Sequence, residues 1–238
     1  KEMLIPFNPA RRATPPKVEK TQANYFQIET VNKITKCLDN EPIKWRALTY
    51  LLILSGCRRG EILGLKWKAV DLDKGILKIE NNLLYSQTRG IYEDTTKNRK
   101  SRLVMIPPEA VKIMKLYRVW YLQEKMANGD RWQANSVWKG SDFVFIQDDV
   151  NPGNPMHPDS ITVWLKRFSE RHELPHINPH AFRHTLASVL ISRGIDIVTV
   201  SKTLGHEKVS TTVDIYAEMM KEASEEASET IAKVIFRS

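Results

Sequence analysis

Apolar residues recur at helical spacing through most of this chain. One amphipathic helix is expected over 28–38, where apolar side chains follow each other at three- and four-residue steps: Ile28, Val31, Ile34 and Leu38. A second, strongly apolar helix is expected from Pro42 to Leu54, with Gly56 as its C-terminal stop. Further helical patterns cover three stretches: 108–126, 158–172, and His180 almost to the end.

Three short stretches have the composition of β-strands instead. Residues 75–79, 82–85 and 102–106 are expected to form one small antiparallel sheet, with Lys97 near the turn before the last strand. The glycine- and proline-rich segment 128–155 is typical of a long surface insertion around a possible strand at 143–146. The pattern as a whole predicts an α+β fold that is mainly helical.

The composition predicts a folded chain and favours a polyanionic partner. The chain has 238 residues, 42% of them hydrophobic, and a formal charge of +8, which favours a nucleic acid as partner, although ordinary basicity is the alternative. Cys37 and Cys57 lie in apolar patterns and are expected to be small core residues in a reducing compartment. No apolar run reaches membrane length and no leader pattern is present, so a cytoplasmic protein is expected.

The first twenty residues differ in character from the rest. Prolines and basic side chains dominate this stretch and few residues there can be buried, so 1–20 is expected to be an interdomain linker that follows a missing upstream domain. A frayed, basic chain end is the alternative.

One helix start has the features of an anion site. Asn178 is a good N-cap and Pro179 a good first residue, so His180 and Arg183 are expected one turn apart on one face, with His184 beside them. A helix N-terminus favours a phosphate because its backbone N–H groups are free. Taken alone, an H-x-x-R pattern is more often a solvated helix face.

The next segment places a histidine and a tyrosine in sequence. Gly205 can end a helix that Asp196 begins, which exposes His206 at a corner, and Ser210 can cap the helix that carries Tyr216. Taken alone, a tyrosine at Tyr216 is more often a half-buried packing residue than a nucleophile.

Three segments together resemble the conserved boxes of the tyrosine recombinases, most closely the phage and conjugative-transposon integrases: SGCRRGE (55–61), NPHAFRH (178–184) and LGHEKVSTTVDIY (204–216). The resemblance implies a mainly helical tyrosine-recombinase catalytic domain with a small antiparallel sheet. It also implies a catalytic set, with Glu61 as a supporting residue: Arg58, Lys97, His180, Arg183, His206 and Tyr216.

The resemblance implies a role for each member of this set. Tyr216 would attack the phosphate to form a 3′-phosphotyrosine, and Lys97 would protonate the departing 5′-oxygen. Arg58 and Arg183 would hold the non-bridging oxygens. His180 would accept the tyrosine proton or bind the phosphate, and His206 would donate to it. No metal ion and no other cofactor would be needed.

Two assignments compete with neighbours, since Lys100 could replace Lys97 and Arg59 could replace Arg58. A wider set of polar and basic residues is expected to contact DNA, although each is as readily a solvated charge: Arg11, Arg12, Lys17, Lys20, Arg59, Lys66, Lys68, Arg89, Arg99, Lys100, His184 and Lys202.

The expected organisation is a linker over 1–20, a catalytic domain over 21–220, and a C-terminal helix over 221–238 that docks in trans after a short connection at Met220. The partners implied are double-stranded DNA, both element ends and target, and further copies in a synaptic tetramer, in the bacterial cytoplasm at the nucleoid and without a membrane. Alternatives are a chromosome-dimer resolvase, a type IB topoisomerase-like enzyme, or a non-catalytic DNA-binding factor.

A zinc protease is rejected although 172–176 reads HELPH, because Pro175 breaks the required helix.

Overall fold

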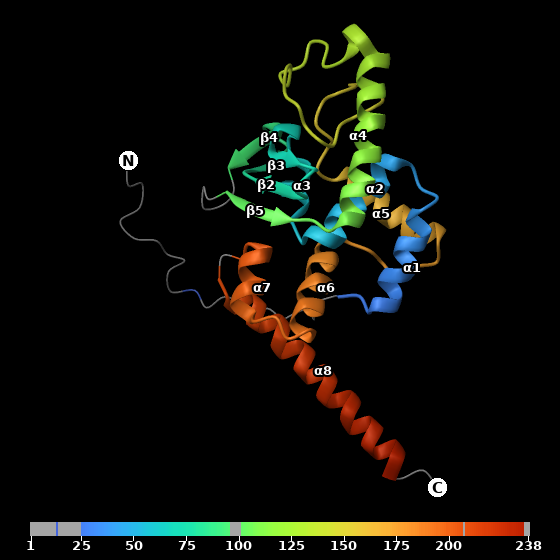
Figure 1. Cartoon of the computed structure of the whole chain (residues 1–238), viewed down its shortest axis with the longest axis vertical. Helices are drawn as coiled ribbons and strands as arrows, with labels where there is room; N and C mark the ends of the chain where they lie inside the picture. The colour runs from blue at the N-terminus through green and yellow to red at the C-terminus, as the bar shows by residue number, and fades with distance from the viewer. Residues whose placement is uncertain (1–12, 14–24, 96–100, 207, 236–238) are drawn as a thin grey trace.

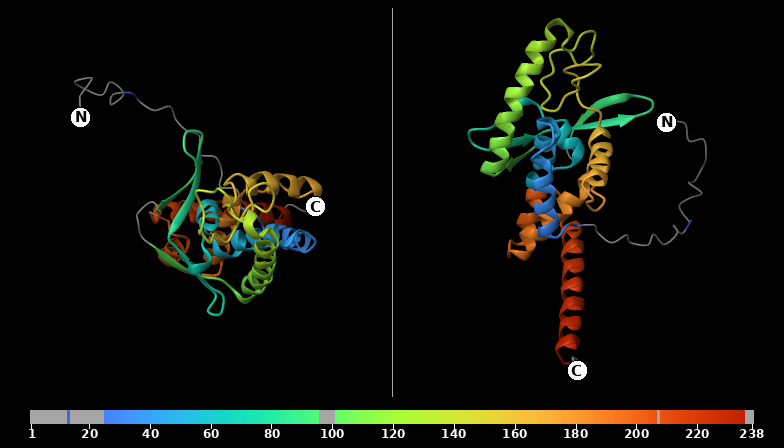
Figure 2. Two further views of the ribbon diagram at one scale, coloured as in Figure 1. Left: turned by 90° about the horizontal axis from the view of Figure 1, so that it is seen from above. Right: turned by 90° about the vertical axis from the view of Figure 1, so that its right-hand side faces the viewer.

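The computed structural model describes residues 13, 25–95, 101–206 and 208–235. Helices make up most of the body, two small sheets lie along one side of it, and the last helix projects away from the rest (Figure 1). Viewed from the side in Figure 2, that helix lies at the opposite end of the molecule from α4. The mainly helical α+β fold predicted from the pattern is confirmed.

The first two helices follow the predicted pattern closely. Helix α1 covers Ile28–Leu38 and α2 covers Ile43–Ser55. Buried residues occur around the whole circumference of α2, as expected for a helix at the centre of the core. Gly56 ends α2 with φ of +60°, and a Cβ there would collide with the side chains of Leu186 and Leu204. Glycine therefore permits both the turn and the close approach of the later helices.

The remaining helices have the expected order. They are α3 (Arg59–Leu63), α4 (Pro108–Asn128), α5 (Ser160–Arg171), α6 (Pro179–Ser192), α7 (Ile197–Leu204) and α8 (Ser210–Ile235), with 3₁₀ turns η2 (Trp67–Ala69) and η3 (Gly129–Arg131). Helix α8 continues without interruption past Met220, so the predicted short connection at that point is wrong. The 221–238 segment begins as the continuation of the helix that carries Tyr216.

The strands form two sheets, where one was predicted. Strands β1 (Val70–Asp71), β2 (Ile76–Ile79) and β5 (Arg102–Met105) make an antiparallel sheet in the order β1-β2-β5, with Leu77 opposite Val104. Strands β3 (Asn81–Ser86) and β4 (Gly90–Thr95) form a separate hairpin, with Leu84 opposite Tyr92. Strand β4 was missed because its sequence GIYEDT is half polar and its partner is local, so no buried face marks it.

The middle of the segment after α4 belongs to the core, which corrects part of its prediction as a surface insertion, whereas its flanks are exposed, with Val137 at 93% and Val150 at 81%. Residues 143–146 are fully buried, yet they form only isolated bridges, Lys66 to Phe143 and Ile146 to Pro155, and no extended strand. The Tyr117 hydroxyl donates to the Val144 carbonyl at 2.7 Å, which fastens the segment to α4. The consecutive apolar residues pack inside the loop, and Pro152, Gly153 and Pro155 are buried with them.

Buried apolar residues form two clusters of unequal size. The main core joins α1 to α5, both sheets and the start of α6. The smaller cluster has five buried members among the described residues, contributed by α6, α7 and α8: Ala187, Ile191, Val200, Leu204 and Ile215. Among the described residues, no helix is long and apolar enough to span a membrane.

Candidate active site

Arg58 occupies the turn between α2 and α3, where a buried carboxylate holds it. Its backbone N–H donates to Glu61 Oε2 at 2.8 Å, and its Nη1 donates to Glu61 Oε1 at 3.0 Å and to the Gly205 carbonyl at 3.1 Å. The Glu61 side chain is only 4% exposed, whereas that of Arg58 is 42% exposed. Arg58 is therefore oriented from behind and open in front, and the predicted supporting role of Glu61 agrees with these contacts.

The sequence reading missed a third arginine at this place. Arg102, the first residue of β5, donates from Nη1 to Glu61 Oε1 at 2.9 Å and from Nη2 to Glu61 Oε2 at 2.6 Å. This parallel two-point contact is the strongest geometry for an arginine–carboxylate pair. The only signal in the sequence was a charged residue at the edge of an apolar strand, which is ordinarily solvent-exposed. We call Arg58, Glu61, Arg102 and Arg183 the arginine cluster.

The charge of Glu61 is stabilised inside this cluster. Burial alone would raise the pKa of the Glu61 carboxyl, but the hydrogen bonds and charge of Arg102, followed by those of Arg58, hold that pKa below its ordinary value. Glu61 is thus a carboxylate at neutral pH and is unsuited to act as a general base, as predicted.

Arg183 reaches the same place from α6. Asn178 caps this helix as predicted, because its Oδ1 accepts from the backbone N–H groups of His180 and Ala181 at 3.0 and 2.9 Å. Arg183 is only 2% exposed, and its Nη1 donates to the carbonyls of Gly56 and Leu204 at 2.8 and 2.6 Å.

One donor of Arg183 is left over. Its Nη2 is buried and has no hydrogen-bond partner among the described residues. Burial first, and the positive charge of Arg58 next, lower the pKa of Arg183 to about 10, so it remains a cation at neutral pH. A buried, charged donor without a partner is costly unless an anion completes the site.

His206 stands at the corner after α7, as predicted from Gly205. Its Nε2 accepts from Arg183 Nε at 3.2 Å, because that guanidinium nitrogen can only donate. The ring proton therefore lies on Nδ1, which donates to Thr212 Oγ1 at 2.7 Å. Burial first, then the charges of Arg183 and Arg58, lower the pKa of His206 to about 3, so the ring is neutral.

His180 and His184 lie one turn apart on α6, with their rings 4.9 Å apart and perpendicular. Burial, then Arg183 and Arg58, lower the pKa of His180, and burial, then His180, lowers that of His184 to about 4. Nδ1 of His184 is buried and has no partner within the described part of the chain. Both rings are therefore neutral at physiological pH and can accept a proton.

Tyr216 lies on the second turn of α8, as predicted. It follows Thr212 by four residues, so both side chains share one face of the helix, and Thr212 Oγ1 in turn contacts His206. Tyr216 is 36% exposed. By contrast, Tyr117 and Tyr121 are buried, and their hydroxyls donate to the Val144 carbonyl and to Asp142, which marks them as structural.

Comparison with known proteins is decisive for the family. The model of the phage integrase family matches residues 24–223. The chain belongs to the phage integrase family. It is similar to a XerC-like tyrosine recombinase of Caldanaerobacter subterraneus subsp. tengcongensis, 30% identical over 97% of this chain and 58% of the relative. It is also similar to the ICEBs1 integrase of Bacillus subtilis, 24% identical over 97% of this chain and 60% of that protein.

Solved structures show the same fold. A XerA recombinase superposes with a TM-score of 0.63 at 21% identity, covering 90% of this chain and 66% of its own. The Tn1549 transposon integrase in complex with circular intermediate DNA superposes with a TM-score of 0.67 at 18% identity, covering 92% and 70%. This integrase-family chain spans about three fifths of the length of the curated relatives named above.

Several residues predicted for the site fall outside the described part of this integrase-family chain. They are the catalytic candidate Lys97 and the DNA-contact candidates Arg11, Arg12, Lys17, Lys20, Arg99 and Lys100. The choice between Lys97 and Lys100 therefore stays a prediction. Arg58, and not Arg59, joins the arginine cluster, because Arg59 turns to α5 and donates to Asp159 and Thr162, both at 2.9 Å.

The other predicted DNA contacts differ in their surroundings. Lys66 is bound to Glu93 at 2.8 Å and lies over the Phe143 ring, with only 16% of its side chain exposed, so it is a structural residue here. The Arg89 guanidinium lies over the ring of Tyr92 in the β3–β4 hairpin. Lys68 and Lys202 are exposed.

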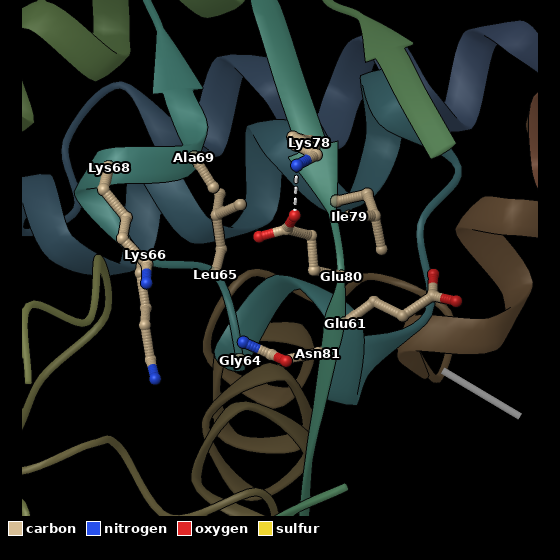
Figure 3. Close-up of a pocket in the computed structure, with 10 residues that line it drawn as sticks. All are labelled: Glu61, Gly64, Leu65, Lys66, Lys68, Ala69, Lys78, Ile79, Glu80 and Asn81. Atoms are coloured by element: carbon tan, nitrogen blue, oxygen red, sulfur yellow. Dashed lines mark ion pairs between the residues drawn. The ribbon is translucent and has the colours of Figure 1, made fainter. Parts of the chain in front are cut away.

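A small cavity behind Glu61 has no room for a substrate. It is lined by Glu61, Gly64, Lys66 and Lys68 among others, and its volume is about 10 Å³. Figure 3 shows an ion pair between Lys78 and Glu80 at its edge, and a Glu61 carboxylate that points away from the two lysines. The functional side of Glu61 is therefore the side that faces the arginines.

Among the residues that the structure describes, no group of three His, Cys, Asp or Glu side chains is placed to hold a metal ion. In the HELPH segment, α5 ends at Arg171, and His172 contacts Glu41 at 3.1 Å. His172 and His176 therefore do not share a helix face, in agreement with the predicted effect of Pro175.

Proposed function

We propose that this chain is the catalytic part of a site-specific DNA recombinase that cuts and rejoins DNA through a 3′-phosphotyrosine, and so integrates and excises a mobile element. The observation that carries the proposal is the meeting of Arg58, Arg183 and His206 at one corner, where Arg183 Nη2 is buried and has no partner among the residues that the structure describes. Three arginines surround one carboxylate there, and this excess of positive charge suits a phosphodiester.

The chemistry assigns a role to each group. Tyr216 Oη attacks the phosphorus, the bond from phosphorus to the 5′-oxygen breaks, and Lys97 gives that oxygen a proton. Arg58, which is open in front, and Arg183 Nη2 bind the non-bridging oxygens and stabilise the charge of the transition state. The phosphotyrosine conserves the bond energy, so rejoining needs no ATP.

The histidines accept protons in this scheme. A lowered pKa keeps His180 neutral at pH near 7, so it can take the proton of the tyrosine. His206 uses Nε2 as an acceptor for Arg183. Donation from His206 to the phosphate therefore requires Arg183 to release Nε2 when DNA binds, and it also requires a ring proton on that nitrogen.

Double-stranded DNA is the proposed substrate, both as element ends and as target, with a synaptic tetramer as the working assembly at the bacterial nucleoid. Supporting observations are the charge of +8 and the fold shared with an integrase solved on DNA. We also propose the division into linker (1–20), catalytic domain (21–220) and a tail (221–238) that docks on a neighbouring copy. In its support, Val234 and Ile235 are 74% and 66% exposed at the end of the projecting helix.

Chromosome-dimer resolution is the second candidate, favoured by the XerC-like relative at 30% identity. Plasmids that carry either the element ends or a chromosomal terminus site separate the two functions. An integrase recombines the first plasmid and a resolvase the second.

A covalent-capture assay tests the proposed chemistry. A duplex with a nick close to the cleavage site loses its short 5′-hydroxyl strand after attack, so the phosphotyrosine accumulates. The expected result is a covalent protein–DNA band on a denaturing gel, formed equally with excess EDTA because arginine, lysine and histidine supply what metals supply elsewhere. Absence of the band on any element end, or its dependence on added magnesium, would refute the proposal.

A further inference from the structure

The two arginines that contact Glu61 are not equivalent. Arg102 engages both carboxylate oxygens, at 2.9 and 2.6 Å, with its side chain 18% exposed. Arg58 makes one side-chain contact, at 3.0 Å, and its side chain is 42% exposed. The charge of Glu61 is therefore neutralised chiefly by Arg102, while Arg58 uses Glu61 mainly for orientation.

Arg102 is also fixed in place from two further sides. Its Nη2 lies 3.6 Å from Cys57 Sγ, and its guanidinium packs against the backbone of Gly205. A Cβ at position 205 would lie 2.7 Å from Arg102 Cζ, so no other residue fits there without displacing the arginine. Arg102 is the first residue of β5. It thus links the start of this strand to the turn before α3 and to the corner before His206.

This arrangement solves an electrostatic problem. A carboxylate close to Arg58 orients it, but an unneutralised negative charge there would also weaken the attraction of Arg58 for the scissile phosphate. A second cation bound to the same carboxylate removes that opposition and leaves the orienting hydrogen bonds intact.

We propose that Arg102 is a positioning residue that neutralises Glu61 and thereby keeps the charge of Arg58 available to the scissile phosphate. The proposal rests on the recombinase function given above. Arg102 need not touch DNA to act in this way. Its loss is expected to slow cleavage because the charge of Glu61 is then no longer neutralised.

The test compares four proteins on the nicked duplex: wild type, Arg102→Gln, Glu61→Gln and the double variant. Arg102→Gln is expected to lower the single-turnover rate of covalent capture about 100-fold, similar to the loss of one transition-state donor, with DNA affinity within about threefold. The double variant is expected to regain about tenfold over Arg102→Gln, because it has no unopposed carboxylate. Arg102→Lys, which keeps charge without the two-point contact, is expected to lie between wild type and Arg102→Gln.

A pH series gives a readout that a merely structural role would not move. The groups that face Glu61 are Arg58, Arg102, Arg183 and Cys57. Without Arg102, the pKa of Glu61 rises and protonation removes its charge at a higher pH. The ratio of the Arg102→Gln rate to the wild-type rate should therefore increase between about pH 7 and about pH 5, and should stay flat for the double variant.

Arg171→Gln is the matched control, since Arg171 forms an arginine–glutamate pair with Glu41 at 2.7 Å outside the arginine cluster. It should cleave at the wild-type rate. Covalent capture by the wild type shows that the proposed recombinase function holds. Failure of the inference about Arg102 can therefore be distinguished from failure of the proposed function. The inference is overturned if Arg102→Gln cleaves normally, if the double variant is no faster than Arg102→Gln, or if the rate ratio does not change with pH. Should Arg102→Gln not fold, Arg102→Met takes its place because it also removes the charge, and normal cleavage by that variant would overturn the inference equally.

Discussion

Arg58, Glu61 and Arg102 rest on the main core, whereas Tyr216 lies on a helix supported by the smaller cluster of five buried residues. Glu61 contacts both Arg58 and Arg102, and Arg183 donates to the carbonyls of Gly56 and Leu204. Helix α8 is held near its start by Thr212 and Ile215, and then projects from the body (Figure 2). The site is therefore assembled from a firmly packed half, for which we propose phosphate binding, and a thinly packed half that carries the proposed nucleophile; we call them the phosphate-binding half and the nucleophile half.

This difference indicates how catalysis is organised. Elements with few buried apolar contacts open at lower free energy than the core. The phosphate-binding half is formed before DNA arrives, as preorganised charge stabilisation requires. The nucleophile half has the lower barrier to movement, so its position can respond to DNA and to neighbouring copies.

The largest expected effect comes from the nucleophile itself. Tyr216→Phe should abolish covalent capture, because only the attacking oxygen is lost, and should leave DNA affinity within about twofold. Denaturing gels and a binding titration measure the two quantities. Tyr85→Phe is the matched control, because Tyr85 is also exposed but lies in the β3–β4 hairpin. An adduct formed by the Tyr216 variant would show that another residue attacks.

Core substitutions test the contrast in packing directly. Leu51→Ala in α2 should lower the free energy of global unfolding by about 3 kcal/mol, since Leu51 is fully buried in the main core. Leu204→Ala in the smaller cluster should chiefly accelerate hydrogen exchange in α7 and α8. Denaturant unfolding with exchange measured by mass spectrometry separates the two. If both variants accelerate hydrogen exchange equally across the whole chain, the two halves unfold as one cooperative unit.

Acid should loosen the nucleophile half first. The pKa values of His184 and His206, about 4 and about 3, lie below that of an unfolded histidine, near 6.5. The unfolded state therefore binds more protons between these values, and stability falls as pH decreases from about 6.5 to about 4. Hydrogen exchange at about pH 5 should rise in α6–α8 before it rises in α2. His184→Asn should reduce this pH dependence, and an unchanged profile would exclude His184 as a cause.

The contact between His206 and Thr212 links the two halves. Thr212→Val keeps the shape but removes the acceptor for His206 Nδ1–H, which should slow covalent capture by about tenfold and lower stability by about 1 kcal/mol. Thr212→Ser retains the hydroxyl and should restore most of the rate. If Thr212→Val and Thr212→Ser cleave equally fast, the hydrogen bond does not orient His206.

The smallest effect on the fold is expected from the end of α8. A stop after Met220 removes the projecting part, so the melting temperature should change by less than about 2 °C. Assembly on DNA, measured by analytical ultracentrifugation, should decrease if the tail docks on another copy. A large loss of melting temperature with unchanged assembly would place the tail in its own core.

Local sequence signals predicted most elements and several helix ends, but not the contacts between distant segments. Asn178 and Gly205 were interpretable because capping depends on a few neighbouring residues. Strand β4 was missed although its partner is adjacent in the chain, because its half-polar sequence has no buried-face pattern. The 143–146 segment was misassigned because glycines and prolines around it are typical of a surface loop, while its burial depends on α4.

The sequence by itself determined the family, the order of the helices and the residue types available for phosphate chemistry, because these follow from local pattern and motif. Only the tertiary structure decided that Arg58 and not Arg59 joins the site, that Arg102 binds Glu61 on both oxygens, and that Arg183 keeps one buried donor free. The physical reason is that side-chain partners, burial and pKa depend on segments far apart in the chain, which meet only when the core forms.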